Sequence, residues 1–352
     1  MMKVSRVTTT ARRKFFYSLM IVSLVSLSIL STLGPIQSVE PISPQCACKS
    51  NKSGKIYDFC YSVPNLQLVG KRFDCGNVEL AEELGVLGGG TVDTSNGMIE
   101  PVFITAFDTS YQPMTKAMIN SFREYFPNAK LIAYSLGGNK SCNVEIRNFD
   151  FNKYGYRRNL KEYRWKPIII AETAREFGSI FWMDSSARFF NSDIQHVFDH
   201  ITRCTNSYAC EQSQYLLFQS SGHGIYPVVT PGMYDFLPTD IDRIKNVTMH
   251  DANFALVLNT DDVVRKILKW DVLCAMEKDC MAPPGSELFC KFGADRHTEY
   301  ARCHRFDQSA INLLLTNEYG FDEHLYCYYK LDFYKILRGK SASKVNEKYV
   351  CK

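Results

Sequence analysis

The sequence lacks the short motifs of several common enzyme classes. No Gly-x-Ser-x-Gly motif occurs, which argues against serine hydrolase chemistry, and no Gly-Lys-Ser/Thr follows the glycines at 88–90, which argues against a phosphate loop there. No Cys-x-x-Cys pair occurs and the histidines are scattered, so a structural zinc site is not expected. No internal repeat or low-complexity tract is visible. One large globular domain with accessory segments is the natural expectation for 352 residues.

A basic surface is also missing once the N-terminus is set aside. Residues 1–14 contain five Lys or Arg and no acid, whereas the whole chain has a formal charge of +4. The remainder therefore carries 4 − 5 = −1. Because nucleic-acid binding depends on clustered positive charge, no nucleic-acid partner is predicted.

Long apolar runs are rare, and the longest lies at residues 15–33. Nineteen helical residues at about 1.5 Å each span roughly 28 Å, close to the thickness of a bilayer core. Basic residues precede the run, which predicts a cytosolic tail at 1–14, a signal anchor at 15–33 and a lumenal remainder. The alternative is a cleaved signal peptide and a secreted protein.

The cysteines and glycosylation sequons agree with a lumenal location. All thirteen cysteines lie after the apolar run, as do the sequons at Asn51, Asn139 and Asn246. The ER or Golgi lumen would allow disulfides. The spacing makes three local pairs plausible: Cys204/Cys210, Cys274/Cys280 and Cys290/Cys303. Since thirteen is odd, one cysteine stays free or pairs between chains, so a disulfide-linked dimer is conceivable.

Two regions follow the anchor. Residues 34–98 show no sustained strand pattern, but four cysteines indicate a small cross-linked stem with one short helix near 77–87. Residues 99–352 form the main domain. Strands are expected at 102–107, 130–135, 144–149, 179–183, 215–218 and 254–258, and helices at 113–126, 167–177, 261–276 and 308–317. This alternation predicts a mostly parallel α/β sheet, with a loop-rich stretch from 220 to 237.

The stretch Gly178-Ser179-Ile180-Phe181-Trp182-Met183-Asp184-Ser185-Ser186-Ala187-Arg188-Phe189 is the centre of this pattern. A glycine ends a helix, a buried strand follows, and polar groups come directly after the strand. Ligands of α/β sheets bind at the carboxyl ends of strands, so Asp184 is predicted to face a ligand. Asp-Ser-Ser also suits a simple turn. The three tryptophans are expected in the core, because the neighbours of Trp182 are apolar.

Three motifs resemble a domain-of-unknown-function family that is abundant in nematodes and is itself similar to GT-A-fold glycosyltransferases of the glycogenin type. They are Tyr163-Arg164-Trp165-Lys166-Pro167, Trp182-Met183-Asp184-Ser185-Ser186-Ala187-Arg188-Phe189 and Cys303-His304-Arg305-Phe306-Asp307-Gln308-Ser309-Ala310-Ile311-Asn312. The resemblance covers about residues 99–335. It implies a GT-A-like (Rossmann-like) sheet flanked by helices, and a Golgi-type enzyme built from anchor, stem and lumenal domain.

The resemblance also implies sugar transfer from a nucleotide-sugar donor to a glycan or glycoprotein acceptor. Catalysis is expected from Asp184 and Asp307, donor contacts from Asp108, Lys166, Ser186, Arg188, His304 and Gln308, and an acceptor-side contact from His223. Four of these residues also have a simpler interpretation: Asp108 as a turn residue, Asp307 as the N-cap of the helix at 308–317, His304 as a structural histidine, and His223 as part of an ordinary loop.

The metal is the open point of this prediction. Related enzymes hold Mn²⁺ or Mg²⁺ with Asp-x-Asp, whereas Ser186 here replaces the second carboxylate. Either Asp184 still holds a metal, or Arg188 and Lys166 neutralise the diphosphate instead. The missing aspartate also favours a second hypothesis, a GT-A-like binding or scaffold protein without catalysis. A secreted lectin-like module is a third.

Overall fold

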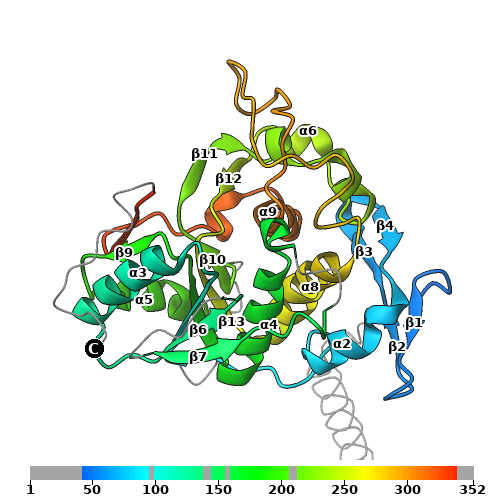
Figure 1. Cartoon of the computed structure of the whole chain (residues 1–352). Helices are drawn as coiled ribbons and strands as arrows, with labels where there is room; N and C mark the ends of the chain where they lie inside the picture. The colour runs from blue at the N-terminus through cyan, green and yellow to red at the C-terminus, as the bar shows by residue number, and fades with distance from the viewer. Residues whose placement is uncertain (1–41, 95–98, 138–143, 155–158, 206–211, 339–352) are drawn as a thin grey trace, which may run out of the picture. The chain divides into compact units, whose positions relative to one another are not determined.

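A six-stranded mixed sheet forms the centre of the fold (Figure 1). The strands, in spatial order, are β10 (Tyr215–Leu217), β13 (Phe254–Leu258), β8 (Ser179–Met183), β5 (Val102–Phe107), β6 (Leu131–Ser135) and β7 (Glu145–Asn148). The four strands from β8 to β7 run parallel, whereas β13 is antiparallel to both of its neighbours. The predicted mixed, mostly parallel α/β sheet is confirmed.

This computed structural model describes residues 42–94, 99–137, 144–154, 159–205 and 212–338. No helix among these residues is long and apolar enough to cross a bilayer. The predicted anchor at 15–33, the sequon at Asn139 and Cys210 of a predicted disulfide lie outside the described residues.

Helices cover both faces of the sheet because its strands are apolar on both sides. In β8, Ile180 and Trp182 belong to one hydrophobic core, and Phe181 and Met183 to the other. The first core is shared with α4 (Trp165–Phe177), α8 (Lys269–Met276) and α9 (Asp307–Glu318), and the second with α3 (Gln112–Tyr125) and α5 (Gln195–Thr205). All three tryptophans are buried, as predicted.

The predicted connection from α4 to β8 is confirmed. Gly178 ends α4 with φ +77°, and its N–H donates to the carbonyl oxygen of Ala174 at 2.8 Å. A Cβ at this position would lie 2.8 Å from a side-chain carbon of Val92. Both the left-handed backbone and the close packing therefore require glycine here.

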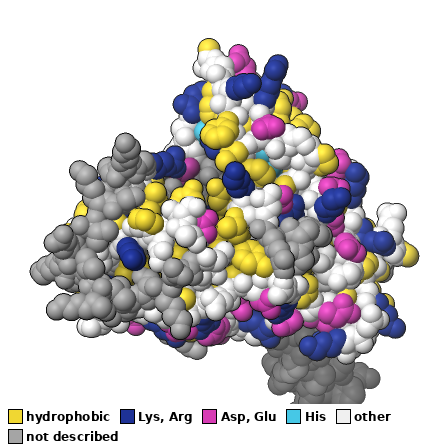
Figure 2. All heavy atoms as spheres, viewed as in Figure 1, with side chains coloured by type: hydrophobic (Ala, Val, Ile, Leu, Met, Phe, Trp, Pro, Cys, Tyr) yellow, Lys and Arg dark blue, Asp and Glu magenta, His cyan; other side chains and the backbone are white. Residues whose placement is uncertain are grey.

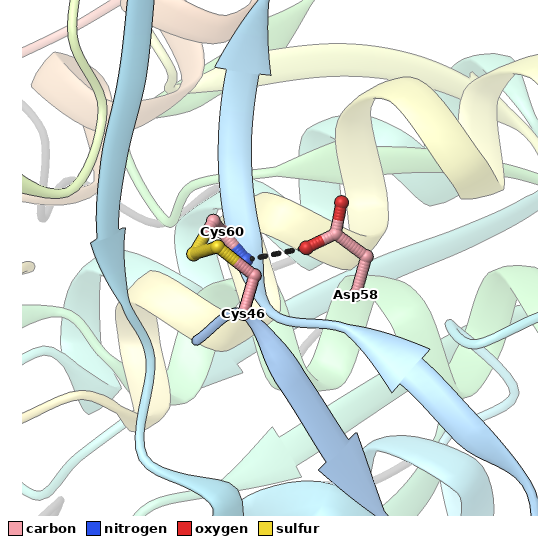
Figure 3. Close-up of side chains that lie close together, drawn as sticks. All are labelled: Cys46, Asp58 and Cys60. Atoms are coloured by element: carbon pink, nitrogen blue, oxygen red, sulfur yellow. Dashed lines mark hydrogen bonds between the residues drawn. A yellow bond between two sulfur atoms is a disulfide. The ribbon is translucent and has the colours of Figure 1, made fainter. Parts of the chain in front are cut away.

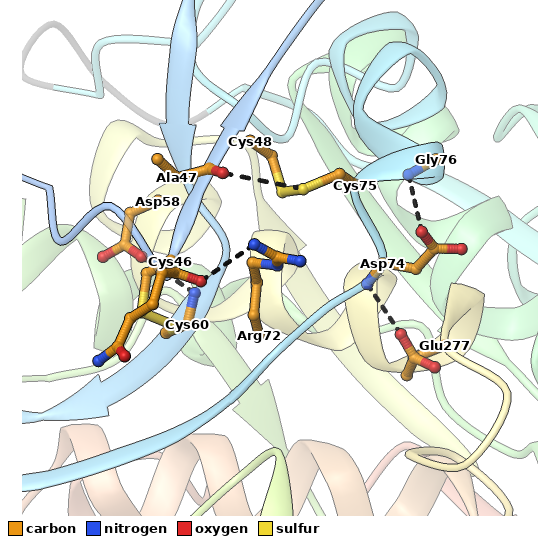
Figure 4. The surroundings of a disulfide bond; sticks show 11 residues. Cys46, Ala47, Cys48, Asp58, Cys60, Arg72, Asp74, Cys75, Gly76 and Glu277 are labelled. Atoms are coloured by element: carbon orange, nitrogen blue, oxygen red, sulfur yellow. Dashed lines mark hydrogen bonds between the residues drawn. A yellow bond between two sulfur atoms is a disulfide. The ribbon is translucent and has the colours of Figure 1, made fainter.

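The segment before the main sheet is more regular than predicted. It holds two antiparallel pairs, β1 (Ala47–Lys49) with β2 (Ile56–Asp58) and β3 (Cys60–Val63) with β4 (Leu68–Arg72), before the predicted helix, α2 (Val78–Glu83). These strands of three to five residues are too short to show a pattern in the sequence. The disulfides Cys46–Cys60 and Cys48–Cys75 cross-link them (Figure 4).

The same segment packs into the core of the main domain. The Phe73 and Tyr61 rings lie 6.2 and 5.4 Å from the ring of Trp270 in α8. The backbone N–H of Asp74 donates to Glu277, which follows α8, at 2.9 Å (Figure 4). From Pro44 onward the chain is one compact unit, and described residues before 98 share a hydrophobic core with the main domain.

Other elements also differ from the sequence predictions. The expected loop at 220–224 is a strand, β11 (Ser220–Gly224), paired with β12 (Thr248–His250). The expected helix at 261–276 runs as α7 (Asp261–Val263), a π-helical turn (Val264–Leu268) and α8. Elements not predicted include the helix α5, the short strands β9 (Ala187–Phe189) and β14 (Tyr334–Ile336), which pair with each other, and the short helix α6 (Ile241–Ile244).

Two of the predicted local disulfides, Cys274–Cys280 and Cys290–Cys303, are confirmed. Cys327 is the free cysteine among the described residues, and its side chain is buried. The sequons at Asn51 and Asn246 both lie on exposed residues, where a glycan could be attached.

Candidate functional site

Lys166 is a buried cation in the first turn of α4. Its Nζ lies 3.3 Å from Asp184 Oδ1 and 3.0 Å from Asp307 Oδ2, and it also donates to the carbonyl oxygen of Ala252. The lysine side chain is 5% exposed. All three N–H bonds of the ammonium therefore have an oxygen acceptor from the protein. The pKa of Lys166 is raised by the two carboxylates despite the opposing effect of burial, so the ammonium stays charged.

Neighbouring residues fix the start of α4. The buried guanidinium of Arg164 donates to the carbonyl oxygens of Ala275, Glu277 and Lys278 at the end of α8, at distances from 2.5 to 3.2 Å. The Trp165 ring lies 6.0 Å from that of Trp182 in β8. The end of α8 and the strand β8 thus hold Lys166 in place.

Asp184 follows β8, as predicted, and its side chain is 39% exposed. Its Oδ1 accepts hydrogen bonds from the Trp182 indole N–H, at 2.8 Å, and from Lys166. Its Oδ2 has no hydrogen-bond partner among the described residues. The carbonyl oxygen of Asp184 accepts from the N–H of Ala187 at 3.0 Å. The backbone therefore makes the turn that the simpler reading expected, while the side chain keeps one oxygen for a ligand.

Asp307 is the first residue of α9 rather than its N-cap, which is Phe306. The carboxylate is directed to Lys166, and its side chain is 10% exposed. Burial raises the pKa of Asp307, and the nearby Asp184 adds to this effect, whereas Lys166 lowers it. Phe306 has φ +47° and ψ −116°, a conformation that favours glycine. Backbone strain of this kind is found at sites that need one fixed geometry.

A pocket of about 140 Å³ opens beside these residues. Its lining consists of Tyr163, Lys166, Asp184, Asp251, Ala252, Asn253, Leu288, Arg305, Phe306, Asp307, Gln308 and Arg338. Pockets for complete drug-sized ligands usually measure about 300–1,000 Å³. The enclosed part therefore fits a small group, such as a diphosphate, with the rest of a larger ligand reaching beyond it.

Among the described residues, Arg305 is the cation of this pocket that has no hydrogen bond or ion pair. Its half-buried guanidinium has no hydrogen-bond or ion-pair partner among the described residues. Arg338 differs, because it forms an ion pair with Asp251 at 3.2 Å. Burial lowers the pKa of Arg305 from its ordinary value of 12.5. A desolvated guanidinium without a partner is costly, so an anionic ligand would stabilise it.

Part of the pocket wall carries a chain of neutral and acidic groups. The Gln308 amide donates to Ser221 Oγ at 2.9 Å, and Ser221 donates to Asp251 at 2.6 Å. Asn253 also donates to Asp251, at 3.0 Å. The side-chain oxygen of Asn253 is buried without a hydrogen-bond partner among the described residues. This wall presents hydrogen-bonding groups of the kind that bind sugar hydroxyls.

Four of the predicted site residues line this pocket: Lys166, Asp184, Asp307 and Gln308. The described lining does not include Asp108, Ser186, Arg188, His223 or His304. Arg188 donates to the backbone oxygens of Ser185, Ala187 and Met114 at 2.6–3.1 Å. The cation beside Asp184 is therefore Lys166 rather than Arg188.

The remaining predicted residues have local partners. Asp108 accepts a hydrogen bond from the N–H of Tyr111 at 3.0 Å, just before α3. His304 is fully buried, and its two ring nitrogens contact the N–H of Thr230 and the carbonyl oxygen of Met281, both at 3.1 Å. Burial lowers the pKa of His304 to about 4. His223 is buried in β11, where its ring lies 5.0 Å from that of Phe292.

Sequence reasoning missed Arg305, although it stands inside a quoted motif between His304 and Phe306. It also missed Asp251, Asn253 and Arg338, which lie far from every motif. A basic residue two positions before Asp307 was the available signal for Arg305. No signal pointed to the others, because only the fold brings them to the pocket.

A divalent cation requires oxygen ligands that are not already paired. Of the three carboxylates in the lining, Asp184 and Asp307 share the ammonium of Lys166, and Asp251 pairs with Arg338 and accepts hydrogen bonds from Ser221 and Asn253. Ser186 is not in the described lining. Elsewhere in the described residues, Cys46, Asp58 and Cys60 come within 4.8 Å of one another (Figure 3). Their sulfurs are joined in a disulfide, so they are not thiolate ligands. Neither place has the open set of oxygen ligands that Mn²⁺ or Mg²⁺ prefers.

The charges on the surface are mixed. On the face shown in Figure 2, Lys and Arg side chains lie among Asp and Glu side chains rather than in one positive field.

Residues 46–171 match the profile of a family described as "Protein of unknown function (DUF1647)". The predicted resemblance to a family of unknown function is confirmed. The matched range includes the first quoted motif at 163–167. It begins earlier than the expected 99, in the disulfide-linked segment. No curated protein matches the sequence.

Solved structures similar to this chain include three glycosyltransferases. The bifunctional enzyme WbbM is 13% identical over 61% of this chain and 37% of its own, with a TM-score of 0.35. The galactosyltransferase LgtC, in complex with donor and acceptor sugar analogues, is 11% identical over 64% of this chain and 72% of its own, with a TM-score of 0.32. GlyE from Streptococcus pneumoniae TIGR4 is 12% identical over 62% of this chain and 44% of its own, with a TM-score of 0.34. The chain thus spans 37% of the length of WbbM and 44% of that of GlyE.

Proposed function

We propose that this protein is a glycosyltransferase that moves a sugar from a nucleotide-sugar donor to a hydroxyl group of a glycan or glycoprotein. One observation carries the proposal: an unpaired guanidinium, Arg305, and a half-free carboxylate, Asp184, line the same pocket at the carboxyl end of β8. The first group suits a diphosphate, and the second suits a sugar hydroxyl.

The position of the pocket supports a nucleotide ligand. The parallel strands of an α/β sheet end at one edge, and ligands of such sheets bind there. The motifs of this chain resemble those of a family similar to GT-A glycosyltransferases, and two of them meet in the pocket through Lys166 and Asp307. A GT-A-like sheet is the fold that this proposal implies.

The proposed reaction follows from the groups present. Asp184 Oδ2 accepts the proton of the acceptor hydroxyl, whose oxygen forms a bond to the anomeric carbon of the donor. The bond between that carbon and the diphosphate oxygen breaks, and its electron pair leaves with the nucleoside diphosphate. Arg305 neutralises the charge that develops on the leaving group. Asp307 acts through Lys166 and is a positioning residue.

The location is part of the proposal. Four disulfides among the described residues suit an oxidising compartment, and two sequons are exposed. We infer a single-pass type II protein of the Golgi or ER, anchored through residues 15–33, with secretion after cleavage as the alternative. A covalent dimer would need a cysteine other than Cys327, because that thiol is buried.

A second function is favoured by one observation. Lys166 already pairs with two carboxylates of the site, Asp184 and Asp307, which a protein that binds sugars without turnover would also tolerate. Such a scaffold protein would bind the nucleotide sugar but release no nucleoside diphosphate from it.

The proposed function is tested by nucleotide binding to the full-length protein. A panel of UDP, GDP, CMP and their sugars is screened by thermal shift with and without Mn²⁺, and hits are titrated by calorimetry. We expect a nucleoside diphosphate to bind and Arg305→Ala to weaken it at least tenfold. Arg302→Ala removes an exposed arginine outside the pocket and serves as the matched control. Failure of every nucleotide to bind the folded protein would refute the proposal.

A further inference from the structure

The ammonium of Lys166 stands where two carboxylates converge on one point. The distances to Asp307 and Asp184 are 3.0 and 3.3 Å, and a backbone carbonyl oxygen completes the set. Two carboxylates and a carbonyl are oxygen ligands of the type that a divalent cation would use. In this protein a side chain of the chain itself occupies the space between them.

We propose that Lys166 replaces a divalent metal in this site and that donor binding and sugar transfer are metal-independent. This inference rests on the proposed glycosyltransferase function, but the Mn²⁺ titration described below tests the role of Lys166 independently of that function. Lys166 does not reach out to the ligand, because all of its N–H donors are used by the protein. Its positive charge offsets one of the two negative charges of Asp184 and Asp307, which would otherwise repel a diphosphate more strongly.

The position of Lys166 in its helix supports a specific purpose. A cation in the first turn of a helix is opposed by the helix dipole, and α4 has no acidic residue in that turn. The side chain is also almost completely buried, which is costly for a charge without partners. The carboxylates that lie against it come from β8 and α9 rather than from its own helix. Charge balance within the site accounts for a lysine here.

Arg305 would then supply the positive charge that a metal ion would otherwise direct toward the diphosphate. Its guanidinium lines the same pocket and has no hydrogen bond or ion pair with a described residue, although the charge of Asp251 acts on it. The planar fork of arginine binds two phosphate oxygens at once, which a lysine cannot do. A divalent cation placed near Asp184 would meet the repulsion of both cations. The two side chains divide the metal's work: Lys166 offsets part of the carboxylate charge, and Arg305 binds the diphosphate.

The test measures Mn²⁺ binding to the full-length protein by the electron paramagnetic resonance of free Mn²⁺, with and without UDP. Wild type, Lys166→Ala and the matched control Lys161→Ala, which removes an exposed lysine outside the pocket, are compared. We expect no tight Mn²⁺ site in the wild type or the control. Removal of the ammonium leaves two carboxylates facing one another, so Lys166→Ala should bind Mn²⁺ at least tenfold more tightly, and Asp184→Asn in that background should abolish the gain.

Two results would overturn the inference. One is a wild-type Mn²⁺ site that Asp184→Asn removes, and the other is a folded Lys166→Ala protein that gains no Mn²⁺ affinity. If Lys166→Ala does not fold, the wild type decides alone. A tight Mn²⁺ site, or nucleotide affinity that is lost in EDTA, overturns the inference. Nucleotide affinity that EDTA leaves unchanged supports it. Should no nucleotide bind at all, the proposed function fails, while the Mn²⁺ titration still decides the role of Lys166.

Discussion

The Nζ atom of Lys166 lies 3.0 Å from Oδ2 of Asp307, although the two residues begin different helices. This contact joins the first and third sequence motifs at the end of the strand that carries the second. It makes the pocket one electrostatic unit, in which a change at one residue alters the pKa and the position of the others.

Removal of Lys166 is expected to destabilise the protein by leaving a buried carboxylate without its partner. Breaking a buried ion pair costs about 3–5 kcal/mol, so Lys166→Met should lower the free energy of unfolding by about 3 kcal/mol or more. Asp307→Asn in the same background should recover part of that loss. Urea unfolding at pH 7 measures both. Equal stability of Lys166→Met and wild type would show that the ion pairs of Lys166 do not stabilise the fold.

The same variant should show a distinct pH dependence. Without Lys166, burial and Asp184 raise the pKa of Asp307 in the folded state, and only the hydrogen bond from the backbone N–H of Gln308 still opposes them. A raised pKa favours folding at low pH, and this contribution is lost as the pH rises through the folded pKa. The stability deficit of Lys166→Met should therefore shrink as the pH falls from 7 toward 4.

At Phe306 a glycine variant should be more stable than an alanine variant, which is the reverse of the usual order. The φ of +47° at Phe306 favours glycine, and strain of this kind costs about 1–3 kcal/mol. Phe306→Gly should therefore unfold with a free energy about 1 kcal/mol higher than that of Phe306→Ala. At the exposed helical position Lys116, the glycine variant should be the less stable one by about 1 kcal/mol. The same order at both positions would exclude strain at Phe306.

His304 should make the protein less stable in mild acid. Its folded pKa of about 4 lies below the ordinary value of 6.5, so the unfolded chain binds the proton more tightly. Stability is lost as the pH falls from about 6.5 toward 4, by about 3 kcal/mol at most. His304→Gln should flatten this part of the curve. Urea midpoints between pH 7 and 4.5 test it, and an unchanged slope in the variant would count against the assignment.

Cys327 should resist alkylation until the protein unfolds. Burial raises the pKa of its thiol, and nearby Glu323 adds to this, so little thiolate forms near neutral pH. Iodoacetamide labelling followed by peptide mass spectrometry should show at least a hundredfold slower reaction of Cys327 in native protein than in urea. Rapid labelling in the native state would show that this thiol is accessible.

Apolar runs in the sequence made the central sheet predictable, whereas the short strands without such runs could not be predicted. The strand at 102–107 and the helix and strand on either side of Gly178 appear with nearly the expected bounds, because each buries a long apolar segment. The pairs β1–β2 and β3–β4 escaped prediction, since strands this short are stabilised by disulfides and by packing on Trp270.

The site was predictable only in part for a related reason. Position after a buried strand identified Asp184, because the strand directs the next residue to the sheet edge. The same logic failed for Arg188, whose strand pairs with β14 and whose guanidinium binds backbone oxygens. The meeting of Lys166 with Asp307 depends on how α4 and α9 pack, which no local pattern reports.

The central claim is tested most directly by the rate at which nucleoside diphosphate is released from nucleotide sugars. The rate is measured for a panel of donors with the full-length protein, in EDTA and in the presence of candidate glycan acceptors. The account predicts release from at least one donor, at least a hundredfold slower for Asp184→Asn and for Arg305→Ala and unchanged for Arg302→Ala. Release that needs added Mn²⁺, or that proceeds equally well in Asp184→Asn and Arg305→Ala, would contradict it.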